Sequence, residues 1–290
     1  MRYKEIKKAS IFGIIGNLLL CIIKGIIGFI TKSEAMIADG FNSAGDIVSS
    51  LMTFIGNKIA SKPSDEDHNL GHGKAEYIYS MLISIIIIIT SFIVIKDSII
   101  SLINKSKLIY SPYLIIVCLI SIAIKLLLYL YTRKLSKKHH NLLIDANSKD
   151  HRNDIFITTI NLVSCILSTK NIYMIDGISG IIIGLWIFYS GIKIFKESYD
   201  ILMDRCISDD IKNEVFKIIS SHQEIKKVIH FNSTPVGYKY QISFTIYVDG
   251  NLTTFESHKI ADNLEKEIDK NIEEIYLTVI HVNPWKTNQS

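Results

Sequence analysis

Six long apolar stretches dominate the sequence, and each has about the length needed to cross a lipid bilayer. A membrane-spanning helix needs about 20 predominantly apolar residues to cross a hydrocarbon core of ~30 Å. The stretches are residues 11–30, 35–59, 77–103, 113–135, 144–167 and 174–202. We therefore expect an α-helical membrane protein, with six transmembrane helices in a domain of residues 1–205.

The second and fifth stretches are the least hydrophobic, because they carry polar residues at helical spacing. Asn42 and Asp46 lie four residues apart in one, and Asp150 and Asp154 lie four apart in the other. Residues at i and i+4 face the same side of a helix, and an ionisable side chain at bilayer depth costs from ~2.5 to more than 10 kcal/mol. We therefore expect these side chains to face the bundle interior and to form a cation path. The alternative is that both stretches are amphipathic helices on the membrane surface.

Basic residues concentrate at one end of the predicted bundle. The N-terminal segment and the second and fourth connections contain Arg2, Lys4, Lys7, Lys8, Lys58, Lys62, Lys74, Arg133, Lys134, Lys137 and Lys138. The opposite connections contain only Lys32, Lys105, Lys107 and Lys170. By the positive-inside rule, both termini and the second connection are cytoplasmic. Because topology explains these clusters and the net charge is only +4, nucleic-acid binding has little support.

A different composition begins near Cys206, where the apolar runs shorten. The pattern predicts helices over 208–221 and 257–268 and strands over 227–232, 238–248 and 275–282, with a hairpin at Pro235-Val-Gly237. The order αββαβ indicates a small α+β sheet with helices on one face. We therefore expect a separate cytoplasmic domain of residues 206–290.

Several classes of protein are disfavoured by what the sequence lacks. It has no GxxxxGK[ST] loop, so neither nucleotide binding nor ATP use is expected. The scattered cysteines, Cys21, Cys118, Cys165 and Cys206, form no zinc or disulfide framework. A membrane metallohydrolase using the same carboxylates and a non-transporting metal sensor remain as alternatives. The short acid-rich connection offers no substrate cleft for the first, and the paired polar spans disfavour the second.

Four motifs add a more specific indication. They are ADGFNSAGD at 38–46, DEDHNLGHGKAE at 65–76, DHRND at 150–154 and DGISG at 176–180. With these motifs the chain resembles the cation diffusion facilitator family of divalent-metal exporters along nearly its whole length. The resemblance implies a homodimer in the plasma or inner membrane, with a metallochaperone-like cytoplasmic domain. It also implies a secondary antiporter, not an enzyme, that exchanges a cytoplasmic divalent metal for protons.

The resemblance places the transport site at Asn42, Asp46, Asp150 and Asp154. Zinc-transporting members typically have Asp at the position of Asn42 and His at that of Asp150. Zinc favours imidazole and thiolate ligands, whereas oxygen-only sites suit harder ions such as Mn²⁺. The set resembles the manganese-exporting bacterial branch, so we predict Mn²⁺ efflux, with Fe²⁺ and Zn²⁺ as the alternatives.

Four other polar residues of the spans, Asp39, His151, Lys24 and Lys125, have roles that the sequence leaves open. His151 is one residue from Asp150, a turn of about 100°, so it should point away from Asp154. Asp39 either shapes the entry or relays protons, or it serves helix packing. The sequence leaves open whether Lys24 and Lys125 extend to the membrane surface or pair with acids.

The resemblance also implies three features outside the spans. A secondary metal site, or alternatively a hydrated loop, falls on Asp65, His68 and His72. A regulatory divalent metal at the dimer interface, or alternatively metal-free histidines, falls on His230, His258 and His281. Asn283 stands where the family has an Asp, which weakens that second site. An ion pair between Lys74 and Asp204 would join the membrane bundle to the tail, contributing ~0–1 kcal/mol if exposed and more if buried.

Overall fold

The computed structural model describes residues 2–31, 34–104, 112–167 and 174–285, although some side chains within these ranges, including those of Asp39, Asn42 and Cys165, lie outside the description. The chain divides into two compact units. The first contains Met1–Lys62 and Ala75–Tyr199, and the second contains Pro63–Lys74 and Asp200–Ser290. The second connection between apolar stretches therefore belongs to the same unit as the C-terminal residues. The predicted domain boundary at residue 205 stays a prediction.

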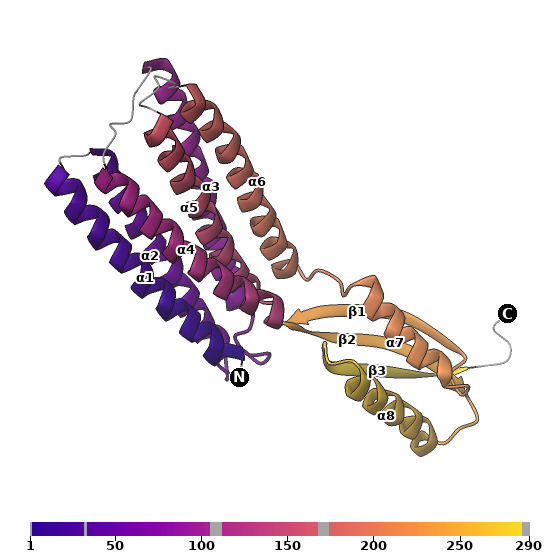
Figure 1. The fold of residues 1–290 in the computed structure, drawn as a ribbon. Helices are drawn as coiled ribbons and strands as arrows, with labels where there is room; N and C mark the ends of the chain where they lie inside the picture. Colours follow the sequence, from indigo (N-terminus) through magenta and orange to yellow (C-terminus); the bar gives the residue numbers. More distant parts are fainter. Residues whose placement is uncertain (1, 32–33, 105–111, 168–173, 286–290) are drawn as a thin grey trace. The chain divides into compact units, whose positions relative to one another are not determined.

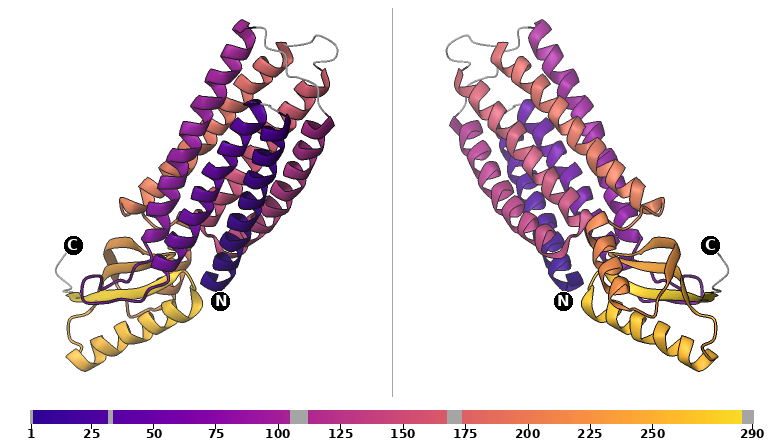
Figure 2. Two further views of the ribbon diagram at one scale, coloured as in Figure 1. Left: turned by 90° about the vertical axis from the view of Figure 1, so that its left-hand side faces the viewer. Right: turned by 90° about the vertical axis from the view of Figure 1, so that its right-hand side faces the viewer.

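Six long helices form the first unit and run side by side (Figures 1 and 2). They are α1 (Arg2–Thr31), α2 (Glu34–Ala60), α3 (Ala75–Asn104), α4 (Pro112–His139), α5 (Leu142–Leu167) and α6 (Met174–Leu202). Each predicted apolar stretch lies within one of them. Among the described residues, segments of α1, α3 and α4 are long and apolar enough by themselves to cross a membrane. The polar residues predicted in α2 and α5 lower the hydropathy of those two helices.

Helices α2 and α5 turn their polar residues inward. The buried polar residues of α2 recur every three or four positions, and they include Ser43, Asp46, Ser50, Thr53 and Asn57. On the opposite side of α2, Val48 and Leu51 are exposed. Helix α5 likewise buries Asn147, Asp150, His151, Asp154 and Thr158. This burial pattern confirms the interior-facing prediction for Asp46, Asp150 and Asp154 and excludes the alternative of two surface helices, which would expose their polar faces. The side chain of Asn42 lies outside the described residues.

Polar bonds join several helix ends at one end of the first unit, which we call the tied end. The bonds are Arg2 Nη2 to Glu76 Oε2 (2.7 Å), the Leu142 backbone N–H to Glu76 Oε1 (3.1 Å), Asn57 Nδ2 to the Tyr3 carbonyl (2.9 Å) and Lys138 Nζ to Glu5 Oε1 (2.8 Å). They link the start of α1 to the start of α3 and to the ends of α2 and α4, and they link the start of α3 to the start of α5. Glu76 is 2 % exposed, so its bonds to two other helices are shielded from water.

The second unit has the predicted αββαβ order, with α7 (Asp209–Ser221), β1 (Lys227–Val236), β2 (Lys239–Asp249), α8 (Thr254–Asn271) and β3 (Ile275–Trp285). In the sheet, β2 is central, antiparallel to β1 and parallel to β3. A single hydrophobic cluster takes Val215 and Ile219 from α7, Leu264 and Ile268 from α8, and alternate residues of β2 such as Ile246. Both helices therefore cover the same face of the sheet, as expected.

Strand β1 is longer than predicted. It passes Pro235 and reaches Val236, which pairs with Lys239, so the reversal lies at Gly237 and the residue after it. Proline is tolerated because β1 is an edge strand, where one backbone N–H can be absent, and Gly237 adopts φ +62°, which glycine accommodates freely. The pairing also shifts between Ile229 and Asn232, where His230 has φ +55°. That bulge is not apparent in the alternating pattern of the sequence.

Candidate metal centre

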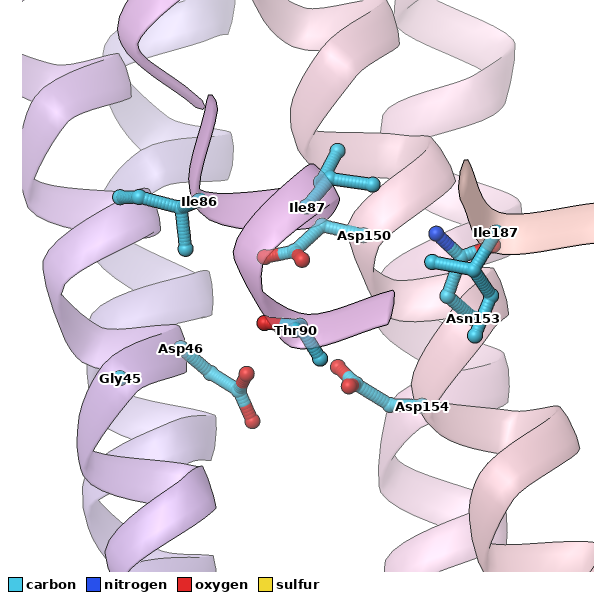
Figure 3. A pocket seen from close by; sticks show the side chains of 9 residues that line it. All are labelled: Gly45, Asp46, Ile86, Ile87, Thr90, Asp150, Asn153, Asp154 and Ile187. Carbon is cyan, nitrogen blue, oxygen red and sulfur yellow. The ribbon is translucent and has the colours of Figure 1, made fainter. Parts of the chain in front are cut away.

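A small pocket between helices of the first unit brings the span carboxylates together. Asp46 comes from α2, and Asp150 and Asp154 come from α5, one turn apart. Their carboxylate groups point toward a common space (Figure 3), and all three residues are at most 8 % exposed. The remaining lining residues are Gly45, Ile86, Ile87, Thr90, Asn153 and Ile187. The pocket thus combines a buried acidic group with an apolar wall.

The ammonium group of Lys125 lies between two of these carboxylates. Lys125 Nζ is 2.7 Å from Asp46 Oδ2 and 2.6 Å from Asp154 Oδ2, and its side chain is 2 % exposed. It projects from α4, a helix that contributes none of the lining residues given above. The question that the sequence left open is therefore answered: Lys125 pairs with acids and does not extend to the membrane surface.

Asp150 is in a different situation from the other two carboxylates. Its Oδ2 is buried and has no hydrogen-bond partner among the described residues, and Lys125 bonds the other two acids. Buried carboxylate oxygens almost always have a partner in folded proteins. An unpartnered oxygen aimed into an acidic pocket is the arrangement that a cation or a water molecule would complete.

Helix α1 supports this region through polar residues that sequence reasoning had not assigned. Asn17 Nδ2 donates to the backbone carbonyl of Asp46 at 3.0 Å and to Ser50 Oγ at 3.2 Å. Lys24 Nζ donates to Ser43 Oγ at 3.1 Å, one turn before Asp46. The available signal for Asn17 was an isolated amide inside the first apolar stretch. Thr90 of α3, which lines the pocket, is likewise a single polar residue inside an apolar stretch, and it was also missed.

Of the residues predicted at or near the transport site, His151 lies away from the pocket, and the side chain of Asn42 is outside the described residues. His151 is fully buried, and it is not among the lining residues. Its Nε2 is 3.8 Å from the point where a Cβ on Gly13 of α1 would lie, so the ring faces α1. The side chain of Asn42 falls outside the described residues, although its backbone lies in α2, one turn before Asp46. Its role as a ligand therefore stays a prediction.

The connection Pro63–Lys74 brings Asp65, His68 and His72 together. Their candidate ligand atoms all lie within 4.8 Å of one another, with His68 Nδ1 3.3 Å and His72 Nε2 3.4 Å from Asp65. The backbone N–H of His68 donates to Asp65 Oδ1 at 2.8 Å and is the main cause that lowers the pKa of this carboxyl. Asp65 thus stays ionised at neutral pH and presents a carboxylate beside two imidazoles, a donor set that suits zinc.

The three tail histidines lie on different elements. His230 is in the bulge of β1, His258 is on α8, and His281 is on β3 with its Nε2 3.1 Å from Asn283 Oδ1. In the part of the chain that the structure describes, they form no cluster of three candidate ligands like that of the connection. A metal bound by these residues would need further ligands, such as those of a second subunit.

The expected pair of Lys74 and Asp204 is formed, with Lys74 Nζ 2.8 Å from Asp204 Oδ1. The two side chains are 40 % and 57 % exposed, so the pair should contribute only the ~0–1 kcal/mol expected of an exposed ion pair. Both residues belong to the second unit, so the prediction that this pair joins the membrane bundle to the tail is wrong: it links the second connection to the C-terminal residues within one unit. Beside them, a Cβ on Gly73 would lie 2.5 Å from Gly237 Cα, which shows that the two backbones are packed against each other.

These contacts predict that backbone packing, more than the ion pair, fixes the connection to its unit. Lys74→Ala should lower the free energy of unfolding by at most about 1 kcal/mol, because water screens the pair. Gly73→Val should cost about 1–3 kcal/mol, because its side chain collides with the Gly237 backbone. Thermolysin cleavage near Leu70 measures detachment of the connection. Equal cleavage rates in the two variants would show that the packing has no special weight.

Comparison with known families agrees with this geometry. The model of the cation efflux transmembrane domain matches residues 10–203, well over half of the chain. The chain belongs to the cation efflux, or cation diffusion facilitator, family. The model of the cytoplasmic domain of cation efflux proteins, a domain named for dimer formation, matches residues 207–285.

Two relatives of this transporter cover almost its full length. The manganese efflux system protein MneP of Bacillus subtilis is 28 % identical over 286 residues, covering 96 % of each chain. The manganese efflux system protein MneS of the same organism is 29 % identical over 290 residues, covering 98 % of each chain. A solved structure, the metal-bound C-terminal domain of the CzcD transporter from Thermotoga maritima, is 27 % identical, with a TM-score of 0.26, and covers 26 % of this chain and 87 % of that one.

Family membership decides between the classes that the sequence left open. The protein is a multi-pass membrane transporter of divalent cations with a dimer-forming cytoplasmic domain, and not an enzyme. The fold predicted from the sequence is thereby confirmed, and the alternatives of a metallohydrolase and a non-transporting sensor are set aside.

Proposed function

We propose that this transporter exports Mn²⁺ from the cytoplasm in exchange for protons, and that Asn42, Asp46, Asp150 and Asp154 hold the metal. The observation that carries the proposal is the composition of the pocket. Three buried carboxylates face it, and no imidazole or thiolate is among its described lining residues. Oxygen-only sites favour hard divalent ions over zinc.

Two further points support manganese over the other metals of the family. MneP and MneS, which match the whole length of the chain, are named for manganese efflux. The nearest imidazole in the helix that carries Asp150, that of His151, faces α1 and not the pocket. Zn²⁺ is the runner-up, although it would lack its preferred nitrogen ligand, and Fe²⁺ is a further alternative that the same oxygen ligands would accept.

The proposed coupling to protons follows from competition for the same oxygens. A divalent ion and protons both bind carboxylates, and both neutralise the charge of Asp46, Asp150 and Asp154. Protons that arrive from outside weaken metal binding and leave the returning site protonated. The basic end of the bundle, with both termini, is cytoplasmic in this proposal, and the subunits work as a homodimer in the lipid bilayer. Asp65, His68 and His72 are proposed as a secondary metal site, and His230, His258 and His281 as ligands of a regulatory divalent metal.

The proposal predicts Mn²⁺ flux driven by a pH gradient. In proteoliposomes containing purified protein, Mn²⁺ uptake should rise when the vesicle interior is made more acidic than the outside, because protons then leave as Mn²⁺ enters. Mn²⁺ uptake should also exceed Zn²⁺ uptake at equal concentration, because oxygen ligands favour the harder ion. Flux is measured with a metal-sensitive dye inside the vesicles, and empty vesicles are the control. Expression should also restore Mn²⁺ tolerance to cells that lack a manganese exporter. Mn²⁺ uptake that does not exceed that of empty vesicles would rule out the proposal.

A further inference from the structure

A buried lysine is an unexpected neighbour for a cation site, and three observations define its place. Lys125 lies on the inward face of α4, in line with the buried Ser121 and Leu128. Its Nζ is bonded to carboxylates of two other helices, Asp46 of α2 and Asp154 of α5. Among the proposed acidic ligands, only Asp150 has a buried oxygen without a partner in the described part of the chain.

The position of Nζ coincides with the place that a bound metal would need. Carboxylate oxygens bind divalent transition metals at about 2.0–2.2 Å. Asp46 Oδ2 and Asp154 Oδ2 both converge on Nζ at 2.7 and 2.6 Å. A metal bridging these two oxygens would lie close to the ammonium, and two cations in a poorly hydrated pocket repel strongly. The ammonium and the metal therefore exclude each other from these oxygens.

We propose that Lys125 is a tethered cation that occupies the metal position in the empty site and that Mn²⁺ must displace in order to bind. This inference rests on the proposed function and deepens it, because it names a residue that regulates the same site. Asp150 is the first contact of the incoming ion, since Lys125 does not engage it. The ion then takes Asp46 and Asp154 from the ammonium.

The arrangement has two consequences for transport. The ammonium holds α2 and α5 together when no metal is present, because two buried carboxylates without a counter-charge would repel each other. It also weakens metal binding, because each ion that binds must first separate Lys125 from its partners. A weaker site releases its metal more readily, which an exporter needs on the outer side.

The test compares Mn²⁺ affinities of full-length variants in nanodiscs at one pH, measured by isothermal titration calorimetry. Lys125→Gln removes the competing charge, and we expect the dissociation constant for Mn²⁺ to fall at least about tenfold. Lys134→Gln is the matched control, since it removes the same charge from an exposed position of α4 and should leave the affinity unchanged. Asp154→Asn tests the proposed site itself and should abolish the binding step that belongs to this pocket, whereas any Mn²⁺ binding by Asp65, His68 and His72 should stay as in the wild type.

The outcomes separate the two ideas. If Asp154→Asn abolishes binding while Lys125→Gln binds Mn²⁺ no more tightly than the wild type, the tethered cation is refuted and the proposed site stands. An equal gain in Lys134→Gln would also refute it, as a general charge effect. Wild-type affinity in Asp154→Asn would overturn the site and the inference together.

Instability of the variant is covered by a second measurement. If Lys125→Gln unfolds without metal, thermal unfolding is followed with saturating Mn²⁺. Rescue by Mn²⁺, with a larger rise in Tm than for the wild type, supports the proposal, because the metal then replaces the missing ammonium. Failure of Mn²⁺ to rescue the fold would overturn it, because Lys125 would then be required even when metal is present.

Discussion

Asp154→Asn and Asp46→Asn should each reduce Mn²⁺ flux in proteoliposomes by at least about a hundredfold. Loss of a residue that only supports a metal ligand typically costs 10–100-fold, and these substitutions remove a proposed charged ligand directly. Both side chains are buried, so no water-exposed group is available to replace the lost oxygen. Each variant also leaves Lys125 with one carboxylate partner in place of two.

The matched control for this prediction is Asp145→Asn. Asp145 lies on α5 as well, but it pairs with Lys149 one turn away and is not among the residues that line the pocket. Its substitution should change flux less than about twofold, because a partly exposed pair contributes little. Detergent-solubilised variants should elute as folded dimers. Wild-type flux in Asp154→Asn or Asp46→Asn, or an equal loss in Asp145→Asn, would mean that the carboxylates have been given the wrong role.

The double variant Asn42→Asp/Asp150→His should shift selectivity from Mn²⁺ toward Zn²⁺. It places an imidazole at the position where zinc-transporting members have one and restores their remaining carboxylate. The softer nitrogen ligand favours four-coordinate zinc, and the Zn²⁺-to-Mn²⁺ flux ratio should rise by about tenfold or more. Asp150 already lies on the pocket side of α5. Its Oδ2 has no partner among the described residues, so removing this oxygen leaves no hydrogen-bond donor unpaired.

Selectivity is measured as the two fluxes in the same batch of vesicles, so that differences in protein content cancel. Each single variant is tested beside the double one to separate the effect of the imidazole from that of the added charge. If the double variant transports metal but its flux ratio stays at the wild-type value, selectivity is determined by packing around the site or by access to it.

Local features of the fold were predictable because they depend on hydrophobic length and periodicity. All six predicted stretches lie within helices, since a membrane span is defined by consecutive residues. The inward orientation of Asp46 and Asp154 followed from the cost of placing a charge in lipid. The error at β1, by contrast, came from reading Pro235 as a strand end, whereas an edge strand tolerates it.

The contacts that complete the site were not predictable from spacing. Lys125 comes from a third helix, 79 residues after Asp46 and 29 before Asp154, and no periodicity relates the three. The same holds for Asn17, whose amide reaches the Asp46 carbonyl from α1. Such contacts depend on how helices are paired in space, which a single sequence does not specify.

The tied end holds one end of α2 in place, so that a tilt of this helix moves its other end further than its middle. Asp46 lies 11 residues before Asn57, which is anchored to α1, and 12 residues after Glu34, where α2 begins. Because distance along a helix grows evenly with residue number, a rigid tilt of α2 about Asn57 moves its Glu34 end about twice as far as it moves Asp46. A shift of Asp46 that is just large enough to break one coordination bond would therefore be about doubled at the Glu34 end of α2. In the proposed transport cycle, release toward the Glu34 end would need only a small angular change of α2, whereas opening the tied end would need its polar bonds to break.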